Sequence, residues 1–121
     1  MQKEKLMTIQ QRENLNDVYV IDEKGNGGAH HKYLCCGKND LGIVGEINFQ
    51  NGARKMDGSI HGIIDSDLLE IVKHRLECFQ AGEFSSEYNE KALYHVTEAL
   101  KWMNKRVEDR ISRNVLGINT K

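Results

Sequence analysis

Proline is absent from the 121-residue sequence, and no run of about 20 apolar residues could form a membrane span. The lack of proline is compatible with long uninterrupted helices, since proline breaks the hydrogen-bond ladder of a helix. Hydrophobic residues make up 39% of the chain and charged residues 29%. This balance favours one compact soluble domain over a disordered or membrane-spanning chain.

The chain has only three cysteines, and two of them, Cys35 and Cys36, are adjacent. This spacing suits no ordinary disulfide framework, and the first residues contain no apolar run of signal-peptide length. We therefore expect a protein of the reducing cytoplasm. The sequence assigns no role to the Cys35 and Cys36 pair or to the His30 and His31 pair.

The formal net charge is only -1, which excludes a generally basic surface for DNA binding. Any anion site must be local. Neither a CxxC pair nor an HExxH helix is present, so we expect no structural metal. The glycine-rich residues 24–31 lack the ending of a P-loop, so we expect no ATP hydrolysis. We also expect no bound cofactor.

The first half of the chain is rich in glycine and in short β-prone runs, which lie at residues 18–21, 32–36 and 45–49. Such runs between glycine-bearing connections predict a small antiparallel sheet. The pairs Asn51-Gly52 and Asp57-Gly58 are favourable for tight turns because both residue types tolerate positive φ.

The spacing of apolar residues changes to that of a helix after Asp65. The residues that share this first helical face are Leu68, Leu69, Val72, Leu76 and Phe79. The pattern predicts a helix from about Ser66 to Gln80, capped by Asp65 or Ser66 and ended by Gly82.

A second helix is predicted to follow, with Ser85 or Ser86 as its cap. Its heptad-like seam consists of Leu93, Val96, Leu100, Met103 and Val107. This seam needs a partner helix, which could be the first helix of the same chain or a helix of another subunit. The sequence thus predicts an α+β fold in a single domain, with a β-rich subregion at 1–64 and a helical hairpin at 65–121.

Basic residues gather near the end of this second helix. Arg106, Arg110 and Arg113 stand at spacings that put them on one face, where guanidinium groups could hold phosphate. Cations near a helix carboxyl terminus also favour the helix dipole, and a solvated basic face explains the pattern equally well. Spacing alone leaves both interpretations open.

The second half also carries the motif FQ-x-GEFSS-x-x-N-x-x-AL, followed by EAL-x-W-x-x-x-R. These motifs lie within about residues 65–117, which resemble the hairpin region of the first Thoeris anti-defence family of bacteriophages. The preceding stretch INFQNGARKMDGSIHGI resembles the sheet and loop of that family. The first 40 residues contribute little to the likeness.

The resemblance implies a phage protein that forms homo-oligomers, as a dimer or hexamer. A pocket at the subunit boundary would bind glycocyclic ADP-ribose, a signal made by bacterial TIR-domain enzymes, and would sequester it without degrading it. Phe79 matches an aromatic position that stacks on the ligand, Asn89 an amide position that orients it, and Arg54 a loop position near its phosphates. From the residues alone, Phe79 would be a core residue, Asn89 a first-turn helix residue and Arg54 a turn charge.

The same resemblance implies a second site that accepts cyclic di- or trinucleotides. Arg106 and Arg110 match arginine positions of that site, and Arg113 could join them. Such a ligand needs a few convergent arginines and no generally basic surface.

Two other functional classes remain open. A hydrolase of a cyclic nucleotide signal could use Asp57, Asp65 and Asp67 as acids and bases, although no nucleophile with an activating base is identifiable. An oligomeric nucleotide-binding regulator could use the basic helix end, although a helix-turn-helix signal is missing. Because no nucleophile with an activating base is identifiable, we predict a protein that is not an enzyme.

Overall fold

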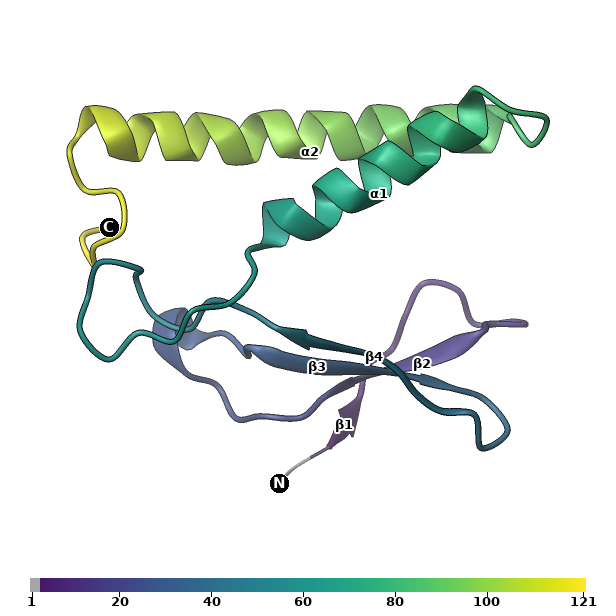
Figure 1. Ribbon diagram of the computed structural model, residues 1–121, viewed down its shortest axis with the longest axis horizontal. Coiled ribbons are helices and arrows are strands. Elements are labelled where there is room, and N and C mark those ends of the chain that lie inside the picture. The colour runs from purple at the N-terminus through teal and green to yellow at the C-terminus, as the bar shows by residue number, and fades with distance from the viewer. Residues whose placement is uncertain (1–2) are drawn as a thin grey trace. The chain divides into compact units, whose positions relative to one another are not determined.

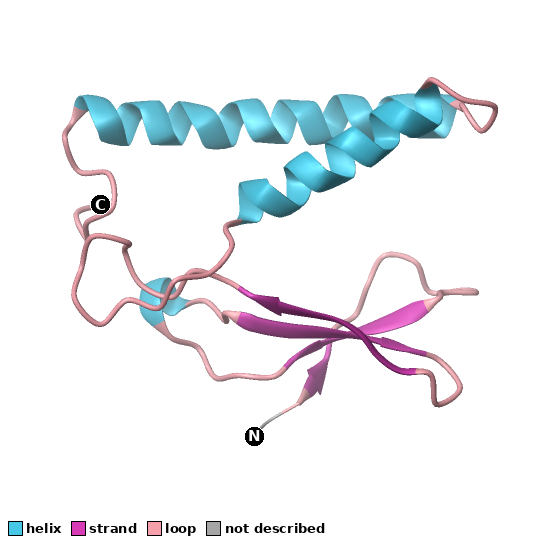
Figure 2. Cartoon of the chain, viewed as in Figure 1, coloured by secondary structure: helices cyan, strands magenta, loops and turns pink. Residues whose placement is uncertain are grey.

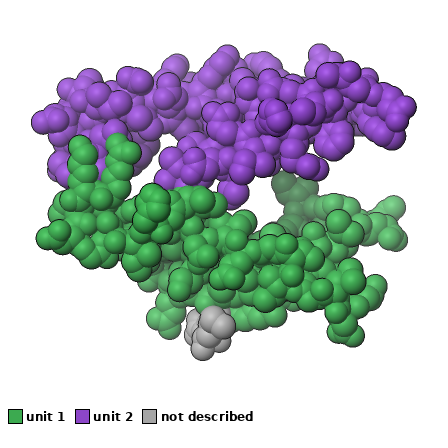
Figure 3. All heavy atoms as spheres, in the orientation of Figure 1, with its two compact units in different colours: residues 1–63 green, residues 64–121 purple. Residues whose placement is uncertain are grey.

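The computed structural model describes residues 3–121 of the chain. They divide into two compact units, the first ending at Ile63 and the second running from Ile64 to Lys121 (Figure 3). The first unit contains the strands and the second contains both long helices (Figures 1 and 2). This arrangement confirms the predicted α+β class.

The first unit is built on one antiparallel sheet with the strand order β1-β2-β3-β4. The strands are β1 (Glu4–Lys5), β2 (Asn16–Val20), β3 (Lys32–Gly37) and β4 (Gly42–Asn48). The last three correspond to the β-prone runs of the sequence, whereas β1 was not expected. Two residues are too few to give a periodic signal, and β1 forms only because β2 offers it a free edge.

The core of this unit is small. Val20, Ile21 and Leu34 are its buried apolar residues. Tyr33 and Phe49 add an edge-to-face contact, with ring centroids 5.7 Å apart. Burial of so few side chains means that turns and polar contacts must also contribute to holding this sheet.

One such polar contact is made by the carboxylate of Asp22, just after β2. It accepts hydrogen bonds from the backbone nitrogens of His31, at 2.9 Å, and Lys32, at 3.2 Å. Burial alone would raise the pKa of Asp22, but these two donors hold its pKa below the ordinary value. His30 Nδ1 lies 2.7 Å from the backbone oxygen of Asp22. The histidine pair therefore belongs to the connection that leads into β3.

The adjacent cysteines lie in β3, where both are half-buried free thiols. Cys35 is opposite Gly45 and Cys36 is opposite Ile43, so the pairing with β4 shifts register between the two cysteines. The unpaired residue is Val44 of β4, so the irregularity has the residue count of a β-bulge in β4.

Helix α1 (Asp65–Gln80) opens the second unit. Its cap position is Ile64, whose backbone nitrogen donates to the carboxylate of Asp67 at 3.0 Å. The prediction that Asp65 or Ser66 caps this helix was therefore wrong, because a carboxylate three residues beyond the cap satisfies the free N–H. The end at Gln80 agrees with the prediction drawn from Gly82.

Helix α2 (Glu87–Ser112) begins at Ser86, whose hydroxyl oxygen accepts a hydrogen bond from the backbone nitrogen of Asn89 at 3.1 Å. Of the two predicted caps, Ser86 is the correct one. Helix α2 packs against α1, and the five seam residues on α2 are half-buried. Within these two fully described helices no apolar side chain is completely buried. No helix in residues 3–121 is long and apolar enough to cross a membrane.

Candidate ligand-binding site

The loop between α1 and α2 is held by side chains at the two helix ends. The side-chain oxygen of Gln80 accepts a hydrogen bond from the backbone nitrogen of Ser86 at 2.9 Å. The side-chain nitrogen of Asn89 approaches the backbone oxygen of Phe84 at 3.5 Å. Because these contacts cross the loop, they fix the last turn of α1 relative to the first turn of α2.

Phe79 lies in that last turn of α1, and 41% of its surface is exposed. The guanidinium carbon of Arg75 lies 5.5 Å from the centre of its ring, within the range of a cation–π contact. Phe79 and Arg75 line a hollow of about 290 Å³ together with His74 and Cys78. The ring is therefore a surface feature of α1, available for stacking, and is not part of a packed core.

Asn89 lies in the first turn of α2 and is half-buried. Its backbone nitrogen is used by the helix cap, so its position is fixed by the fold. Among the described residues no donor contacts its side-chain oxygen, which leaves an acceptor for a ligand. Phe79 and Asn89 thus flank the same loop and lie at the same end of the hairpin.

Arg54 belongs to the first unit, in the connection that follows β4. The backbone of Asn51 pairs with that of Ile60 in both directions, at 2.9 and 2.8 Å, and closes the base of this loop. Gly52 and Gly58 adopt positive φ angles of 98° and 79°, as the turn-favouring pairs of the sequence require. Arg54 is exposed, and in residues 3–121 no carboxylate forms a salt bridge with it.

The structure gives Arg110 a role that the sequence did not suggest. Only 7% of this residue is exposed, and its Nη2 nitrogen donates to the backbone oxygens of Val115 and Ile118, each at 2.9 Å. Two hydrogen bonds to carbonyl oxygens hold the segment after α2 against the helix end. We refer to residues 114–121 as the C-terminal strap.

Arg113 also makes hydrogen bonds near the end of α2. Its Nε donates to the carboxylate of Asp109 at 3.0 Å, and its Nη1 donates to the backbone oxygen of Lys121 at 2.7 Å. Arg106 is exposed and has no hydrogen bond or salt bridge within the described part of the chain. The three arginines therefore do not present one open basic face in this conformation.

A hydrolase could use the carboxylates of Asp57, Asp65 and Asp67, and each of these has a local place in the fold. Asp67 caps α1, and Asp65 is an exposed residue of the first turn. Asp57 belongs to the first unit, in the turn before Gly58. In residues 3–121, histidine, cysteine and acidic side chains form no group of three that could hold a metal ion.

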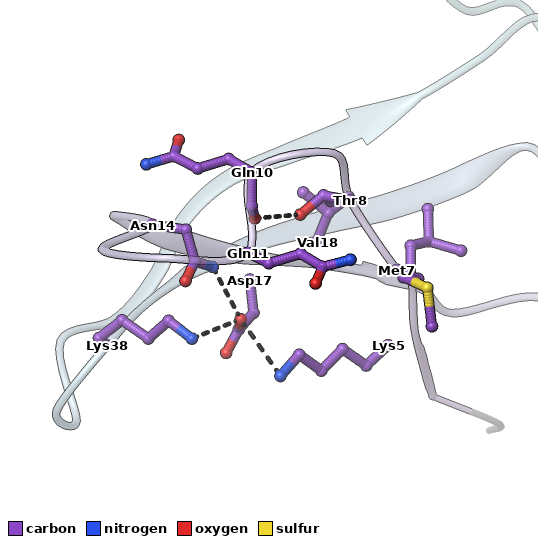
Figure 4. Close-up of a pocket in the computed structure, with 10 residues that line it drawn as sticks. Lys5, Met7, Thr8, Gln10, Gln11, Asn14, Asp17, Val18 and Lys38 are labelled. Atoms are coloured by element: carbon purple, nitrogen blue, oxygen red, sulfur yellow. Dashed lines mark hydrogen bonds and ion pairs between the residues drawn. The ribbon is translucent and has the colours of Figure 1, made fainter.

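A second hollow, of about 350 Å³, lies in the first unit around Asp17 (Figure 4). The Nζ atoms of Lys38 and Lys5 lie 2.7 and 3.5 Å from one oxygen of Asp17, and Asn14 approaches the same oxygen at 3.4 Å. The hydrogen bond from Lys38 lowers the pKa of Asp17 below its ordinary value. These contacts tie the residues before β2 to the sheet, which makes the cluster an anchor of the fold.

The comparisons with known proteins match the sheet edge and the hairpin. The family model described as "Acb2/Tad1, hairpin domain" matches residues 42–108, a range that includes Arg54, Phe79, Asn89 and Arg106. The fold and this match define a protein of the Acb2/Tad1 hairpin class.

A relative named "Thoeris anti-defense 1", from Bacillus phage SBSphiJ7, is 36% identical over 105 residues. The alignment covers 84% of this chain and 72% of that relative. The chain belongs to the Thoeris anti-defence family, as the motifs of the hairpin predicted.

Proposed function

We propose that this protein inhibits Thoeris immunity by binding glycocyclic ADP-ribose and sequestering it without degrading it. The observation that carries the proposal is the exposed ring of Phe79 at the end of a hairpin that also presents Asn89. Family membership supports the choice of ligand, because the relative is named for an action against Thoeris.

The three proposed ligand-binding residues suit the chemistry of a cyclic ADP-ribose. The ring of Phe79 offers dispersion and stacking to the adenine. The amide of Asn89 can donate to or accept from a base or ribose. The guanidinium of Arg54 can form charge-assisted hydrogen bonds with phosphate oxygens, and no salt bridge in residues 3–121 competes for it.

We further propose that the pocket is completed by association of identical chains, in a dimer or hexamer. The packing of α1 on α2 leaves large apolar side chains accessible, among them Ile71, at 58% exposed, and Val72, at 42%. Exposed apolar side chains of this size favour association. Enclosure between subunits would also remove water from the ligand's phosphates and strengthen their contacts with arginine.

A sequestering protein must reduce the free signal below the level that activates its effector. Each copy then captures signal stoichiometrically, and the dissociation constant should be nanomolar, or about -12 kcal/mol. Turnover is not required. The protein would act in the cytoplasm of the infected bacterium, where the signal is made.

The proposal extends to a second ligand. The helix end around Arg106 would bind cyclic di- or trinucleotides through their phosphates. Arg106 is the member of the basic trio whose guanidinium is exposed and unengaged in residues 3–121.

Isothermal titration calorimetry with glycocyclic ADP-ribose tests the first site. Phe79→Ala should weaken binding by about fivefold to 150-fold, since stacking on one base contributes about 1–3 kcal/mol. Tyr94→Ala removes another exposed aromatic side chain from the hairpin and serves as the matched control, with unchanged affinity expected.

Arg54→Ala is expected to lose affinity for the same ligand, whereas Lys55→Ala, which removes the neighbouring exposed charge, should not.

Equal affinity in wild type and Phe79→Ala would remove Phe79 from the site. If the wild-type protein does not bind glycocyclic ADP-ribose, an oligomeric regulator that binds another nucleotide is favoured. If the calorimeter records the continuing heat of a reaction that converts the ligand, a hydrolase is favoured.

A further inference from the structure

The glycine-rich connection between β2 and β3 has no part in the function proposed above, although its backbone is held at both ends. The backbone nitrogen of Gly25 donates to the backbone oxygen of Ala29 at 2.8 Å and closes a loop around the short 3-10 turn Asn26–Gly28 (Figure 2). The carboxylate of Asp22 accepts two backbone hydrogen bonds where the connection enters β3. The position of this loop is therefore fixed relative to the sheet.

Asn26, the first residue of this turn, reaches the connection that carries Arg54, residues 51–60, which we call the Arg54 loop. Its Nδ2 atom donates to the Oδ1 atom of Asn51 at 2.7 Å. The two residues are 25 positions apart in the sequence, so the bond joins two separate loops of the first unit. Asn51 is also bonded through its backbone to Ile60 in both directions. The side-chain bond therefore ties the glycine-rich connection to the base of the Arg54 loop.

Gly52 lies against the amide of Asn26. A Cβ atom placed on Gly52 would lie 3.2 Å from Nδ2 of Asn26 and 3.2 Å from Cβ of Ser59. The φ angle of Gly52 is 98°, a conformation that other residues rarely adopt. A glycine at this position thus gives both the turn and the room for the amide. Since Gly52 precedes Arg54 by two residues, this contact sets the direction in which the chain continues to Arg54.

A second side-chain amide, that of Gln50, holds the same stretch of chain. Its Nε2 atom donates to the backbone oxygen of Gly52 at 3.2 Å. Its Oε1 atom accepts from the backbone nitrogen of Gly62 at 3.1 Å, so one side chain joins the two limbs of the Arg54 loop. Two amides from different parts of the first unit, Asn26 and Gln50, therefore restrain the backbone at Gly52.

Arg54 depends on this restraint. Its side chain is exposed, and in residues 3–121 no carboxylate forms a salt bridge with it, so the place of its guanidinium follows from the backbone of the loop. A mobile loop must be ordered when it binds a ligand, and that ordering reduces the affinity. A loop that is ordered before the ligand arrives avoids most of this loss.

We propose that Asn26 and Gln50 are positioning residues for Arg54. Through their contacts with Asn51 and Gly52 they order the Arg54 loop in the free protein, so that the guanidinium meets a ligand phosphate with little loss of entropy. The proposal rests on the proposed capture of glycocyclic ADP-ribose and adds the residues that hold its phosphate-binding arginine. The glycine-rich connection is then a support for the Arg54 loop and does not itself bind phosphate.

The free protein gives the first test, because it needs no ligand. Nitrogen-15 relaxation measures the backbone order parameter at Arg54, which should be about 0.85 in the wild type and fall to about 0.6 or below in Asn26→Ala. The urea midpoint should stay nearly unchanged, since the lost bond is exposed. Gln11→Ala, which removes another exposed amide of the first unit, is the matched control. An unchanged order parameter in Asn26→Ala would overturn the proposal.

Calorimetry with glycocyclic ADP-ribose gives the second test. Asn26→Ala should weaken binding about threefold to tenfold, the effect of one hydrogen bond. In the Arg54→Ala background the same substitution should have no further effect, because a positioning residue acts only through the residue that it positions. Gln50→Leu should show the same dependence on Arg54. A residue that only stabilises the fold, or that touches the ligand itself, would not show this dependence.

The outcomes separate the two proposals. A wild-type protein that binds the signal, together with losses from Asn26→Ala and Arg54→Ala that simply add, would overturn the positioning role and leave the capture of the signal standing. A wild-type protein that binds no glycocyclic ADP-ribose would overturn both.

Discussion

The side-chain oxygen of Gln80 accepts a hydrogen bond from the backbone nitrogen of Ser86, 2.9 Å away. This bond joins the last residue of α1 to the cap of α2 and spans the connection between the two helices. Since Phe79 precedes Gln80 and Asn89 depends on the cap at Ser86, the relationship sets the spacing of the two proposed ligand-binding side chains.

Replacing Gln80 with leucine removes this bond while keeping a side chain of similar size. The free energy of unfolding should fall by about 1 kcal/mol, the usual contribution of one hydrogen bond. Affinity for glycocyclic ADP-ribose should fall several-fold because the loop is no longer fixed. Urea denaturation and calorimetry measure the two effects, and Glu83→Ala, in the same loop, is the control. A variant with wild-type affinity would show that the spacing is set elsewhere.

Asn89→Asp separates ligand binding from stability. Aspartate loses the long 3.5 Å contact with the backbone oxygen of Phe84, but an acid in the first turn of a helix interacts favourably with the helix dipole, so the thermal midpoint should be about preserved. A negative charge beside a ligand that carries phosphates should weaken its binding by about tenfold or more. Retained affinity at a retained thermal midpoint would remove Asn89 from the ligand site.

Much of the fold could be predicted because its signals are local. Alternating β-prone runs and turn pairs indicated β2 to β4, and the apolar periodicity indicated both helices and the Ser86 cap. The cap of α1 could not be predicted reliably, because Ile64 has no side-chain acceptor and Asp67 supplies the oxygen from inside the helix. Strand β1 was missed because two residues have no period.

The candidate ligand-binding site could be predicted only in part from the sequence. The motif of the hairpin pointed to Phe79 and Asn89, but helical periodicity alone would have placed Phe79 in the core, since it shares the apolar stripe of α1. Spacing placed Arg110 on a basic face and left open whether that face binds phosphate or is merely solvated. Its actual partners are backbone oxygens of Val115 and Ile118, and no sequence pattern encodes which carbonyl groups a strap will present.

Arg110→Lys tests the role of the strap. Lysine keeps the charge near the end of α2 but lacks the planar fork that contacts two carbonyl oxygens. The backbone nitrogen of Val115 donates to the backbone oxygen of Arg110, and that of Ile118 donates to the backbone oxygen of Val115. Hydrogen exchange at these two nitrogens should accelerate about fivefold or more, as expected for loss of about 1 kcal/mol of local stability. Arg106→Lys, at an exposed position, should leave exchange unchanged. Identical exchange in both variants would contradict the clamp.

The lowered pKa of Asp22 predicts a specific loss of stability in acid. Because the pKa of Asp22 is lower in the folded state than in the unfolded chain, its contribution to stability is present above the unfolded-state pKa and is lost as the pH falls through the folded-state pKa. Urea midpoints recorded from pH 6 down to pH 2.5 should therefore fall less steeply in Asp22→Asn than in the wild type. Glu23→Gln, which removes the adjacent exposed acid, should follow the wild-type curve.

Capture of intact signal tests the central proposal most directly. The purified protein is incubated with glycocyclic ADP-ribose, free ligand is removed, the complex is denatured by heat, and the released molecules are identified and counted by mass spectrometry. Sequestration predicts intact cyclic ligand in a fixed ratio to protein, with less ligand retained by Phe79→Ala after free ligand is removed. Linear ADP-ribose accumulating beyond one equivalent per chain would show turnover and contradict the account.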